Sequence, residues 1–399
     1  MSKKSVESKV NKSLLFVSHS YSTFVKDQIE QVSDHFDNVT ILSRYNPISE
    51  ISNILPIHSL RPFKKASIID LSDKPSNVNV IVTPIFYVPT DSGYKNLGEK
   101  HFKIVERKIE RDNIRFDLIH SHFLWSAGYV GAKLKEKYNV PFVVTAHGYD
   151  IYDLPFRDNE WKEKIRYVLD SADCIITVSN SNLKCIRELN AKTPVHVIPN
   201  GFRSDLFYPQ DSKECRKKLN LPLDRMILLS VGCVYDEVKG GKYLIEAIRE
   251  IVKHRKDILC ILIGSGELKN KLQKQIKKAE LENYIILAGG RPHNEIPIWM
   301  NACDIFVLPS LNEGNPTVMF ECLGCGKPFV GTKVGGVPEI IISEDYGLLA
   351  EPANSKDLAE KILIALDKDW DCEKIRAYAG RFTWENITKE ILIIYQHVI

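Results

Sequence analysis

Short apolar runs alternate with amphipathic segments along most of the chain, which is the pattern of parallel, doubly wound α/β sheets. The first half predicts helices over residues 24–35, 99–112 and 125–138 and strands over residues 14–18, 39–42, 79–86, 117–120, 142–145 and 174–179. The second half repeats the arrangement, with strands over 226–231, 259–263 and 285–287 and another that enters the stretch 307–339. The pattern therefore predicts two Rossmann-like halves. Residues 44–76, rich in Pro, Ser and charge, predict no regular element, and we consider them as a mobile acceptor loop.

The stretch 307–339 joins an apolar strand to a polar loop and a helix. Asn315 is expected to cap this helix and Pro316 to be its first residue, while Gly326 and Pro328 end it after two or three turns. The first turn of a helix offers unpaired backbone N–H groups and the positive end of the helix dipole. The loop therefore predicts a binding site for an anion such as a phosphate.

Two carboxylates flank that predicted anion-binding site. Glu313 lies on the loop, and Glu321 falls in the second turn, about 8 Å along the helix axis. This spacing suits a ribose diol at Glu321 and a second polyhydroxylated group at Glu313, beside the amides of Gly314 and Asn315. The spacing alone is equally compatible with a solvated helix that carries two ordinary surface acids.

The motif Glu313-x7-Glu321, with GNP after the first Glu, CGKP after the second and VGGVPE beyond, resembles the donor-site signature of family 4 glycosyltransferases. The resemblance runs from about residue 115 to residue 385. It implies a retaining, nucleotide-sugar-dependent enzyme of the α/β GT-B fold, with two Rossmann-like doubly wound domains facing a central cleft and a C-terminal helix that returns to the first domain. The implied domains are an acceptor-binding part, 1–200 with 383–399, and a nucleotide-sugar-binding part, 201–382.

The resemblance also implies roles for individual residues. Glu313, with Gly314, Asn315 and Pro316 next to it, would bind the donor sugar and phosphates, and Glu321 would bind the ribose. His147, in TAHGYD, resembles a histidine that contacts the donor sugar. A histidine that merely caps a loop is the alternative.

The segment GCVYDEVKGGK is a glycine-rich turn in which Gly232 and Lys239 are expected to clamp a diphosphate. Family members usually carry an Arg where this chain has Cys233. Either another cation, Lys242 or Arg291, substitutes for it, or transfer is weak. By resemblance the loop Gly290–His293, which contains Arg291, lies against the nucleotide base.

His120 and His122 stand at the carboxyl end of a predicted strand, where open α/β sheets bind ligands, and are the acceptor-side candidates. We expect no metal there, on the argument that the strand end puts the two rings on opposite faces and no third ligand is near. No cofactor is expected besides the donor, which is a substrate. Asp367, Asp369 and Asp371 are predicted to form a solvated turn rather than a metal site.

Composition narrows the class of protein further. The 399-residue chain is 44% hydrophobic and 26% charged with a net charge of +3, which argues against nucleic-acid binding. Its nine cysteines lack zinc-site spacing and indicate a reducing compartment, with Cys322 and Cys325 as packing residues. No apolar run approaches 18 residues. We expect a cytoplasmic protein, with a possible peripheral site at the inner face of the membrane.

The combined prediction is a retaining, metal-independent transfer of sugar from a UDP- or GDP-sugar to a hydroxyl of a glycan or polyprenyl-linked acceptor. A membrane-borne acceptor is a hypothesis based on Arg61, Lys64, Lys65 and the charged helix 99–111, which lie in the acceptor half. Two alternatives stay open: a nucleotide-sugar-binding partner subunit with little activity of its own, suggested by Cys233, and a nucleotide-sugar epimerase. The sequence names neither the sugar, the base nor the linkage.

Overall fold

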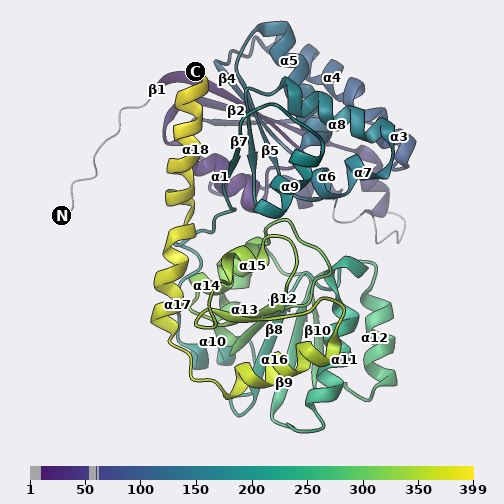
Figure 1. Cartoon of the computed structure of the whole chain (residues 1–399), viewed down its shortest axis with the longest axis vertical. Coiled ribbons are helices and arrows are strands. Elements are labelled where there is room, and N and C mark those ends of the chain that lie inside the picture. The colour runs from purple at the N-terminus through teal and green to yellow at the C-terminus, as the bar shows by residue number, and fades with distance from the viewer. Residues whose placement is uncertain (1–9, 54–59, 61–62) are drawn as a thin grey trace, which may run out of the picture. The chain divides into compact units, whose positions relative to one another are not determined.

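The computed structural model describes residues 10–53, 60 and 63–399, which fold as two α/β units (Figure 1). The N-terminal unit contains the chain up to Pro199 together with Trp384–Ile399, and the C-terminal unit contains Asn200–Thr383. Each unit has its own parallel sheet, which confirms the predicted α/β class and the two Rossmann-like halves.

The N-terminal unit is built on seven parallel strands in the order β3-β2-β1-β4-β5-β6-β7. In the register of this sheet, Phe16 of β1 lies opposite Ile41 of β2 on one side and His120 of β4 on the other. The strand order therefore reverses between β1 and β4, which is the topological switch point of a doubly wound sheet. The strands are β1 (Val10–Ser18), β2 (Phe36–Tyr45), β3 (Val78–Pro84), β4 (Leu118–His122), β5 (Phe142–Ala146), β6 (Cys174–Thr177) and β7 (Val195–Val197).

Helices cover both faces of this sheet. They are α1 (Thr23–Ser33), η1 (Pro47–Asn53), α2 (Lys65–Ile68), α3 (Asp91–Lys95), α4 (Leu97–Asp112), the π-helical turn η3 (Leu124–Gly128), α5 (Tyr129–Tyr138), α6 (Tyr149–Tyr152), α7 (Leu154–Arg157), α8 (Asn159–Ser171), α9 (Asn180–Glu188) and α18 (Trp384–Val398). The sequence predicts no regular element in the segment 44–76. In the structure its first two residues are the last two of β2, and η1 and α2 follow within the segment. Residues 54–59 and 61–62, including Arg61 of the membrane hypothesis, lie outside the described residues.

The last helix belongs to the first sheet. Trp384, Ile391 and Tyr395 of α18 are buried in one cluster with Phe16 of β1 and Ile29 of α1. Figure 1 shows α18 beside α1. The predicted return of the C-terminal helix to the first unit is thus confirmed.

The C-terminal unit has six parallel strands in the order β10-β9-β8-β11-β12-β13, and its order reverses between β8 and β11. The strands are β8 (Met226–Val231), β9 (Ile258–Ile263), β10 (Ile285–Gly289), β11 (Ile305–Leu308), β12 (Phe329–Thr332) and β13 (Gly347–Ala350). The helices are α10 (Ser212–Lys218), η4 (Glu237–Lys239), α11 (Gly241–Ile251), α12 (Lys269–Lys278), η5 (His293–Glu295), α13 (Ile296–Ala302), α14 (Thr317–Gly324), α15 (Val337–Ile340), α16 (Ser355–Asp367), α17 (Cys372–Ala379) and η6 (Gly380–Phe382).

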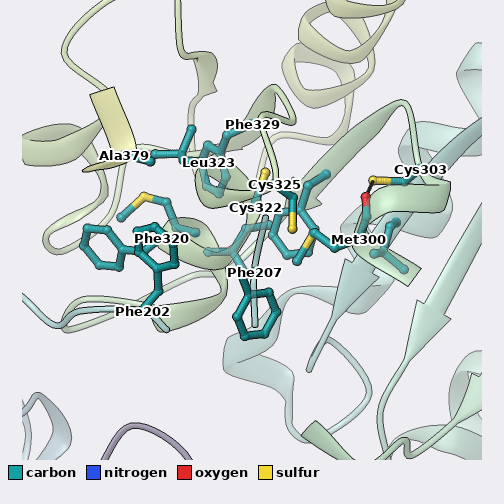
Figure 2. Close-up of a cluster of buried hydrophobic side chains, with 14 of the residues drawn as sticks. Phe202, Phe207, Met300, Cys303, Phe320, Cys322, Leu323, Cys325, Phe329 and Ala379 are labelled. Atoms are coloured by element: carbon teal, nitrogen blue, oxygen red, sulfur yellow. Dashed lines mark hydrogen bonds between the residues drawn. The ribbon is translucent and has the colours of Figure 1, made fainter. Parts of the chain in front are cut away.

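Helix α14 sits on a dense apolar cluster. Figure 2 shows Phe202 and Phe207, from the start of the unit, in the cluster that contains Phe320, Cys322 and Cys325. The backbone of α14 lies close to the Phe202 ring, since a Cβ on Gly324 would be 2.3 Å from it. Both cysteines are fully buried, which confirms that they are packing residues. This cluster fixes the helix on which Glu321 stands.

No helix among the described residues is both long and apolar enough to cross a lipid bilayer.

Candidate active site

The loops that follow β8 and β11 flank the switch point of the C-terminal sheet. Open α/β sheets bind ligands at this position, outside the carboxyl ends of the strands. The first loop contains Gly232 and Lys239, and the second runs from Pro309 to Pro316 into α14. Leu311 donates its backbone N–H to the carbonyl of Val238 over 2.6 Å. The two loops therefore form one continuous backbone surface.

An ion pair joins the two loops. Lys239 Nζ lies 2.8 Å from Glu313 Oε1 and 3.0 Å from Oε2, and the hydroxyl of Ser310 donates to Oε1 over 2.7 Å. Asp236 accepts the backbone N–H of Lys239 over 3.1 Å and so fixes the start of η4. The Glu313 side chain is 8% exposed and that of Lys239 is 32% exposed. The sequence interpretation gave Lys239 and Glu313 separate roles and did not predict that they pair.

Glycines bring the backbone close behind this pair. Gly335 has a φ of +51°, and a Cβ there would lie 1.6 Å from the carbonyl oxygen of Glu313. The next residue, Gly336, donates its N–H to the carbonyl of Gly314 over 2.9 Å. Only glycine fits position 335, because a side chain would collide with the loop that carries Glu313.

The predicted capping of α14 is wrong. The helix begins at Thr317, and Pro316, in an extended conformation, is the residue that precedes it. The side-chain oxygen of Asn315 instead accepts the backbone N–H of Asn200 over 2.9 Å, while Asn200 Nδ2 donates to the Asn315 carbonyl over 2.8 Å. Asn200 thus competes successfully for the group that would cap the helix. No side chain caps the first turn of α14, so its N–H groups remain available to an anion.

Glu321 lies in the second turn of α14, as predicted. It is 5% exposed, and its Oε1 lies 2.8 Å from His293 Nε2 at the start of η5. Its Oε2 is buried and has no hydrogen-bond partner. Glu313 and Glu321 are both buried, so the alternative of two ordinary surface acids is wrong. The sequence placed His293 near the base but missed its contact with Glu321.

The other predicted donor residues lie at the same edge of the sheet but are not bonded to this pair. Gly232, with a φ of +91°, faces open space where a Cβ would stand. Arg291 is exposed, donates to the Ala288 carbonyl over 3.1 Å and lies over the Trp299 ring. Lys242 lies over the ring of Tyr243, 4.7 Å from its centroid.

Cys233 points away from this surface. It is 1% exposed within the apolar cluster behind β8, and this burial raises the pKa of its thiol to about 11. A long cation could not occupy the same side-chain position without opening that cluster.

A row of histidines lies at the switch point of the N-terminal sheet. His120 and His122 stack with their ring centroids 4.8 Å apart, so the prediction that they face opposite sides of the strand is wrong. Side chains two residues apart on a strand point the same way. His120 is fully buried, and its ring nitrogens bond the hydroxyls of Tyr395, over 2.5 Å, and Thr145, over 2.7 Å. Both nitrogens of His120 are therefore engaged within this unit.

The row continues to His147. His122 Nδ1 and His147 Nε2 share a hydrogen bond of 2.9 Å, while His122 Nε2 and His147 Nδ1 are buried without partners. Burial lowers the pKa of His147 well below its ordinary value and that of His122 to about 3. Both rings are thus neutral at pH 7, and one donates the shared proton while the other accepts it.

Asp150 holds the loop that carries His147. Its carboxylate accepts the backbone N–H groups of His147 over 3.2 Å, Gly148 over 2.8 Å and Leu124 over 2.8 Å. Burial raises the pKa of this carboxyl even though these N–H groups favour its charged form. The sequence analysis missed Asp150, although Asp side chains in loops commonly accept the backbone N–H groups of neighbouring residues.

No group of three or more His, Cys, Asp or Glu residues that could hold a metal ion occurs in the part of the chain that the structure describes. The three late aspartates are exposed, as predicted, with Asp367 at the end of α16, Asp369 between the helices and Asp371 directly before α17. Asp367 pairs with Arg255 over 2.7 Å, and Asp371 accepts the N–H of Lys374 at the start of α17.

Two doubly wound units, with polar residues gathered at both switch points, are the architecture of GT-B glycosyltransferases. Residues 211–382 match the model of the "Glycosyl transferases group 1", and residues 62–206 match that of "Glycosyltransferase Family 4". The chain belongs to this family of GT-B glycosyltransferases, as the sequence predicts. It is 33% identical over 303 residues to the uncharacterized glycosyltransferase MJ1178 of Methanocaldococcus jannaschii, a match that covers 74% of this chain and 79% of the relative.

Solved structures share the fold. Sucrose-phosphate synthase (tll1590) from Thermosynechococcus elongatus superposes with a TM-score of 0.77 at 22% identity, over 97% of this chain and 99% of the other. Anabaena Alr3699/HepE, solved in complex with UDP-glucose, superposes with a TM-score of 0.72 at 20% identity, over 97% of this chain and 100% of the other.

Proposed function

We propose that this glycosyltransferase moves a sugar, with retention of configuration and without a metal ion, from a UDP- or GDP-sugar to a hydroxyl of a glycan or lipid-linked saccharide. One observation carries the donor proposal. At the switch point of the C-terminal sheet, Lys239 pairs with Glu313, and Glu321 has one buried carboxylate oxygen without a hydrogen-bond partner. The UDP-glucose complex of HepE supports a nucleotide-sugar donor, since this chain shares its fold.

Glu321 is proposed to bind the ribose. A buried carboxylate oxygen without a hydrogen-bond donor is costly, and a ribose hydroxyl would supply that donor to Oε2. His293 already occupies the other oxygen and so limits the rotation of the carboxylate.

Lys239 is proposed to stabilise the departing diphosphate. Its ammonium group has three N–H donors, of which two are directed at the oxygens of Glu313, so one is left for a phosphate oxygen. The free N–H groups at the start of α14 would add to this stabilisation. Glu313 then has two tasks: it positions the ammonium group, and it accepts hydrogen bonds from donor-sugar hydroxyls.

Retention is proposed to proceed by substitution on one face of the sugar. The bond from the anomeric carbon to the diphosphate breaks, the bond to the acceptor oxygen forms on the same face, and the leaving phosphate oxygen takes the acceptor's proton. In this scheme His147, as a neutral ring, contacts a sugar hydroxyl and need not act as a base.

A membrane-borne acceptor is part of the proposal. Helix α4 exposes four basic residues at helical spacing, Lys100, Lys103, Arg107 and Arg111, and Lys65 is exposed as well. Flotation with vesicles that contain anionic phospholipid should carry the protein upward, whereas neutral vesicles should not. Equal behaviour with both vesicle types would contradict this part and leave the donor site untouched.

The buried Cys233 favours a second candidate function, a partner subunit that binds nucleotide-sugar but transfers it poorly, because one expected cation is missing. Donor binding without transfer to any acceptor would support this second candidate. Conversion of the donor sugar without an acceptor would instead indicate an epimerase.

Calorimetric titration with UDP, GDP and their sugar conjugates tests the donor proposal. We expect one conjugate to bind wild-type protein and to bind Glu321→Gln at least tenfold more weakly, because a neutral amide is the poorer acceptor. Glu344→Gln, a change at an exposed glutamate of the same unit, is the matched control and should bind normally. Folded wild-type protein that binds no nucleotide would refute the proposal.

A further inference from the structure

A cationic cluster lies at the carboxyl ends of β1, β2 and β3 in the N-terminal unit. We call Arg44, Tyr87, Tyr94, His19 and His101 the Arg44 cluster. Arg44 is the second-last residue of β2, His19 follows β1, and Tyr87 follows β3. Tyr94 lies in α3 and His101 in α4. The cluster therefore occupies the ligand-binding edge of the sheet, close to the switch point between β1 and β4.

The guanidinium group of Arg44 is held by aromatic rings. Its Nη1 donates to the hydroxyl of Tyr87 over 2.9 Å, and its central carbon lies 5.5 Å and 5.7 Å from the ring centroids of Tyr87 and Tyr94. Its Nε is buried and has no hydrogen-bond partner. These contacts fix the position of the cation but do not use all its donors.

Arg44 has no carboxylate within ion-pair distance among the described residues, although it is only partly exposed. Arg216, a buried arginine of the C-terminal unit, differs from it, because its guanidinium pairs with Asp304 over 2.6 Å. A largely buried cation is costly unless an anion compensates it. The Arg44 cluster thus carries an unbalanced positive charge.

The other members of the Arg44 cluster supply no negative charge, although the buried carboxyl of Asp150 lies near enough to Tyr94 to help raise its pKa. Burial and the charge of Arg44 both lower the pKa of His19 and His101, the latter to about 3, so both rings are neutral at pH 7. The hydroxyl of Tyr94 donates to the carbonyl of Trp125 over 3.2 Å, and burial raises its pKa to about 12. An anion must therefore come from outside the cluster.

We propose that the Arg44 cluster binds an acceptor that carries a phosphate or carboxylate group next to its sugar. The planar guanidinium matches the geometry of either anion, and the partly exposed ring of Tyr87, which Arg44 contacts, adds apolar surface for an attached sugar ring. This inference rests on the proposed function, in which the N-terminal unit holds the acceptor. It adds that the acceptor is anionic.

The test is equilibrium binding to the full chain at low salt, with glucose, glucose 6-phosphate, glucuronate and inorganic phosphate as probes. Vesicles of phosphatidylcholine with and without a polyprenyl phosphate form a separate arm for a lipid-borne anion. We expect glucose 6-phosphate or glucuronate to bind about tenfold or more tightly than glucose, or the polyprenyl phosphate to confer vesicle binding. Arg44→Gln should abolish that preference.

The matched control is Arg187→Gln, which removes the same charge from an exposed arginine of the same unit and should keep the preference. Arg44→Lys, which keeps the charge, should retain part of it and guards against loss of folding. The proposal is overturned if no charged probe exceeds its neutral counterpart in wild-type protein, if Arg44→Gln keeps the preference, or if inorganic phosphate binds as tightly as every conjugate.

The same samples are titrated with UDP and GDP. Nucleotide binding without anion preference would refute the anionic acceptor and leave the donor proposal standing. Anion preference without nucleotide binding would refute the donor proposal and leave the anion site of the Arg44 cluster standing.

Discussion

The two switch points of this protein have the same topology, but the polar groups that they bury differ in charge. Between β1 and β4, three histidines lie in a row, buried and neutral, and the carboxylate of Asp150, which holds the His147 loop, accepts three backbone N–H groups. Between β8 and β11, a lysine and a glutamate form an ion pair and a second glutamate keeps one unbonded oxygen. The fold determines where a ligand can bind, and the side chains at that place determine which chemistry it meets.

The difference concerns how each unit tolerates buried polar groups. In the N-terminal unit desolvation is accommodated by keeping imidazoles uncharged. In the C-terminal unit the charge of Glu313 is retained and compensated by a partly exposed lysine. We therefore expect acid and charge-removing substitutions to affect the two units differently.

The largest effect is expected from Lys239→Met. Loss of a preorganised donor to a leaving group typically costs about a hundred- to a thousandfold in rate. The measurement is kcat for sugar transfer, or for hydrolysis of the donor when no acceptor is known. Lys253→Met, which removes an exposed lysine of the same unit, should be near normal. Turnover by Lys239→Met within a few-fold of wild type would contradict the proposed role.

Acid should destabilise the histidine row. The pKa of His122 is about 3 in the folded protein and about 6.5 in the unfolded chain, so below pH 6.5 the unfolded state binds the extra proton. The free energy of unfolding should fall by about 1.4 kcal/mol per pH unit for this ring alone, or about 2.7 kcal/mol at pH 4.5. The effect is absent above pH 7, where both states are neutral.

Urea unfolding at several pH values measures this slope. His122→Asn should reduce it by about one proton, whereas His196→Asn, at an exposed histidine of the same unit, should not. A slope that is the same in wild type and His122→Asn would mean that the ring does not titrate as its burial implies.

Asp150→Asn should weaken the His147 loop. An amide has one acceptor oxygen in place of two, so the N–H of Leu124, or those of His147 and Gly148, would lose a partner. We expect a loss of about 1–3 kcal/mol in the free energy of unfolding, with nucleotide affinity of the C-terminal unit unchanged. Asp153→Asn, at a nearby aspartate bonded to the exposed Arg157, is the control. A loss of UDP affinity in Asp150→Asn would contradict the expectation that this change affects the N-terminal unit alone.

The smallest effect is expected from His293→Ala. Removing this ring frees the Glu321 carboxylate to rotate and costs one hydrogen bond, which is worth about 0.5–1.5 kcal/mol. UDP should bind about two- to tenfold more weakly by calorimetry. His254→Ala, an exposed histidine of the same unit, should bind as wild type does. Unchanged affinity in His293→Ala would remove His293 from the list of positioning residues.

The sequence predicted the fold well because hydrophobic periodicity is a local signal that both sheets retain. It also placed Glu321 correctly, since helix geometry alone sets the second turn. It failed where the outcome depends on a distant partner. The Lys239–Glu313 pair spans 74 residues, and the cap expected from Asn315 is lost to Asn200, 115 residues away.

The placement of His120 and His122 on opposite faces was an error of a different kind. A strand repeats every two residues, so the sequence alone should have put both rings on one face. The stacking of His122 on His147, by contrast, depends on the neighbouring strand, so a local sequence pattern could not predict it.

Helix α18 has a consequence for biosynthesis. The ribosome makes residues 384–399 after the whole of the C-terminal unit, yet these residues cover α1, and Tyr395 bonds His120, which lies 275 positions earlier. Multidomain chains usually fold in order of synthesis. Here the half that is translated first is completed last, so its α1 face stays uncovered while nearly two hundred further residues are translated.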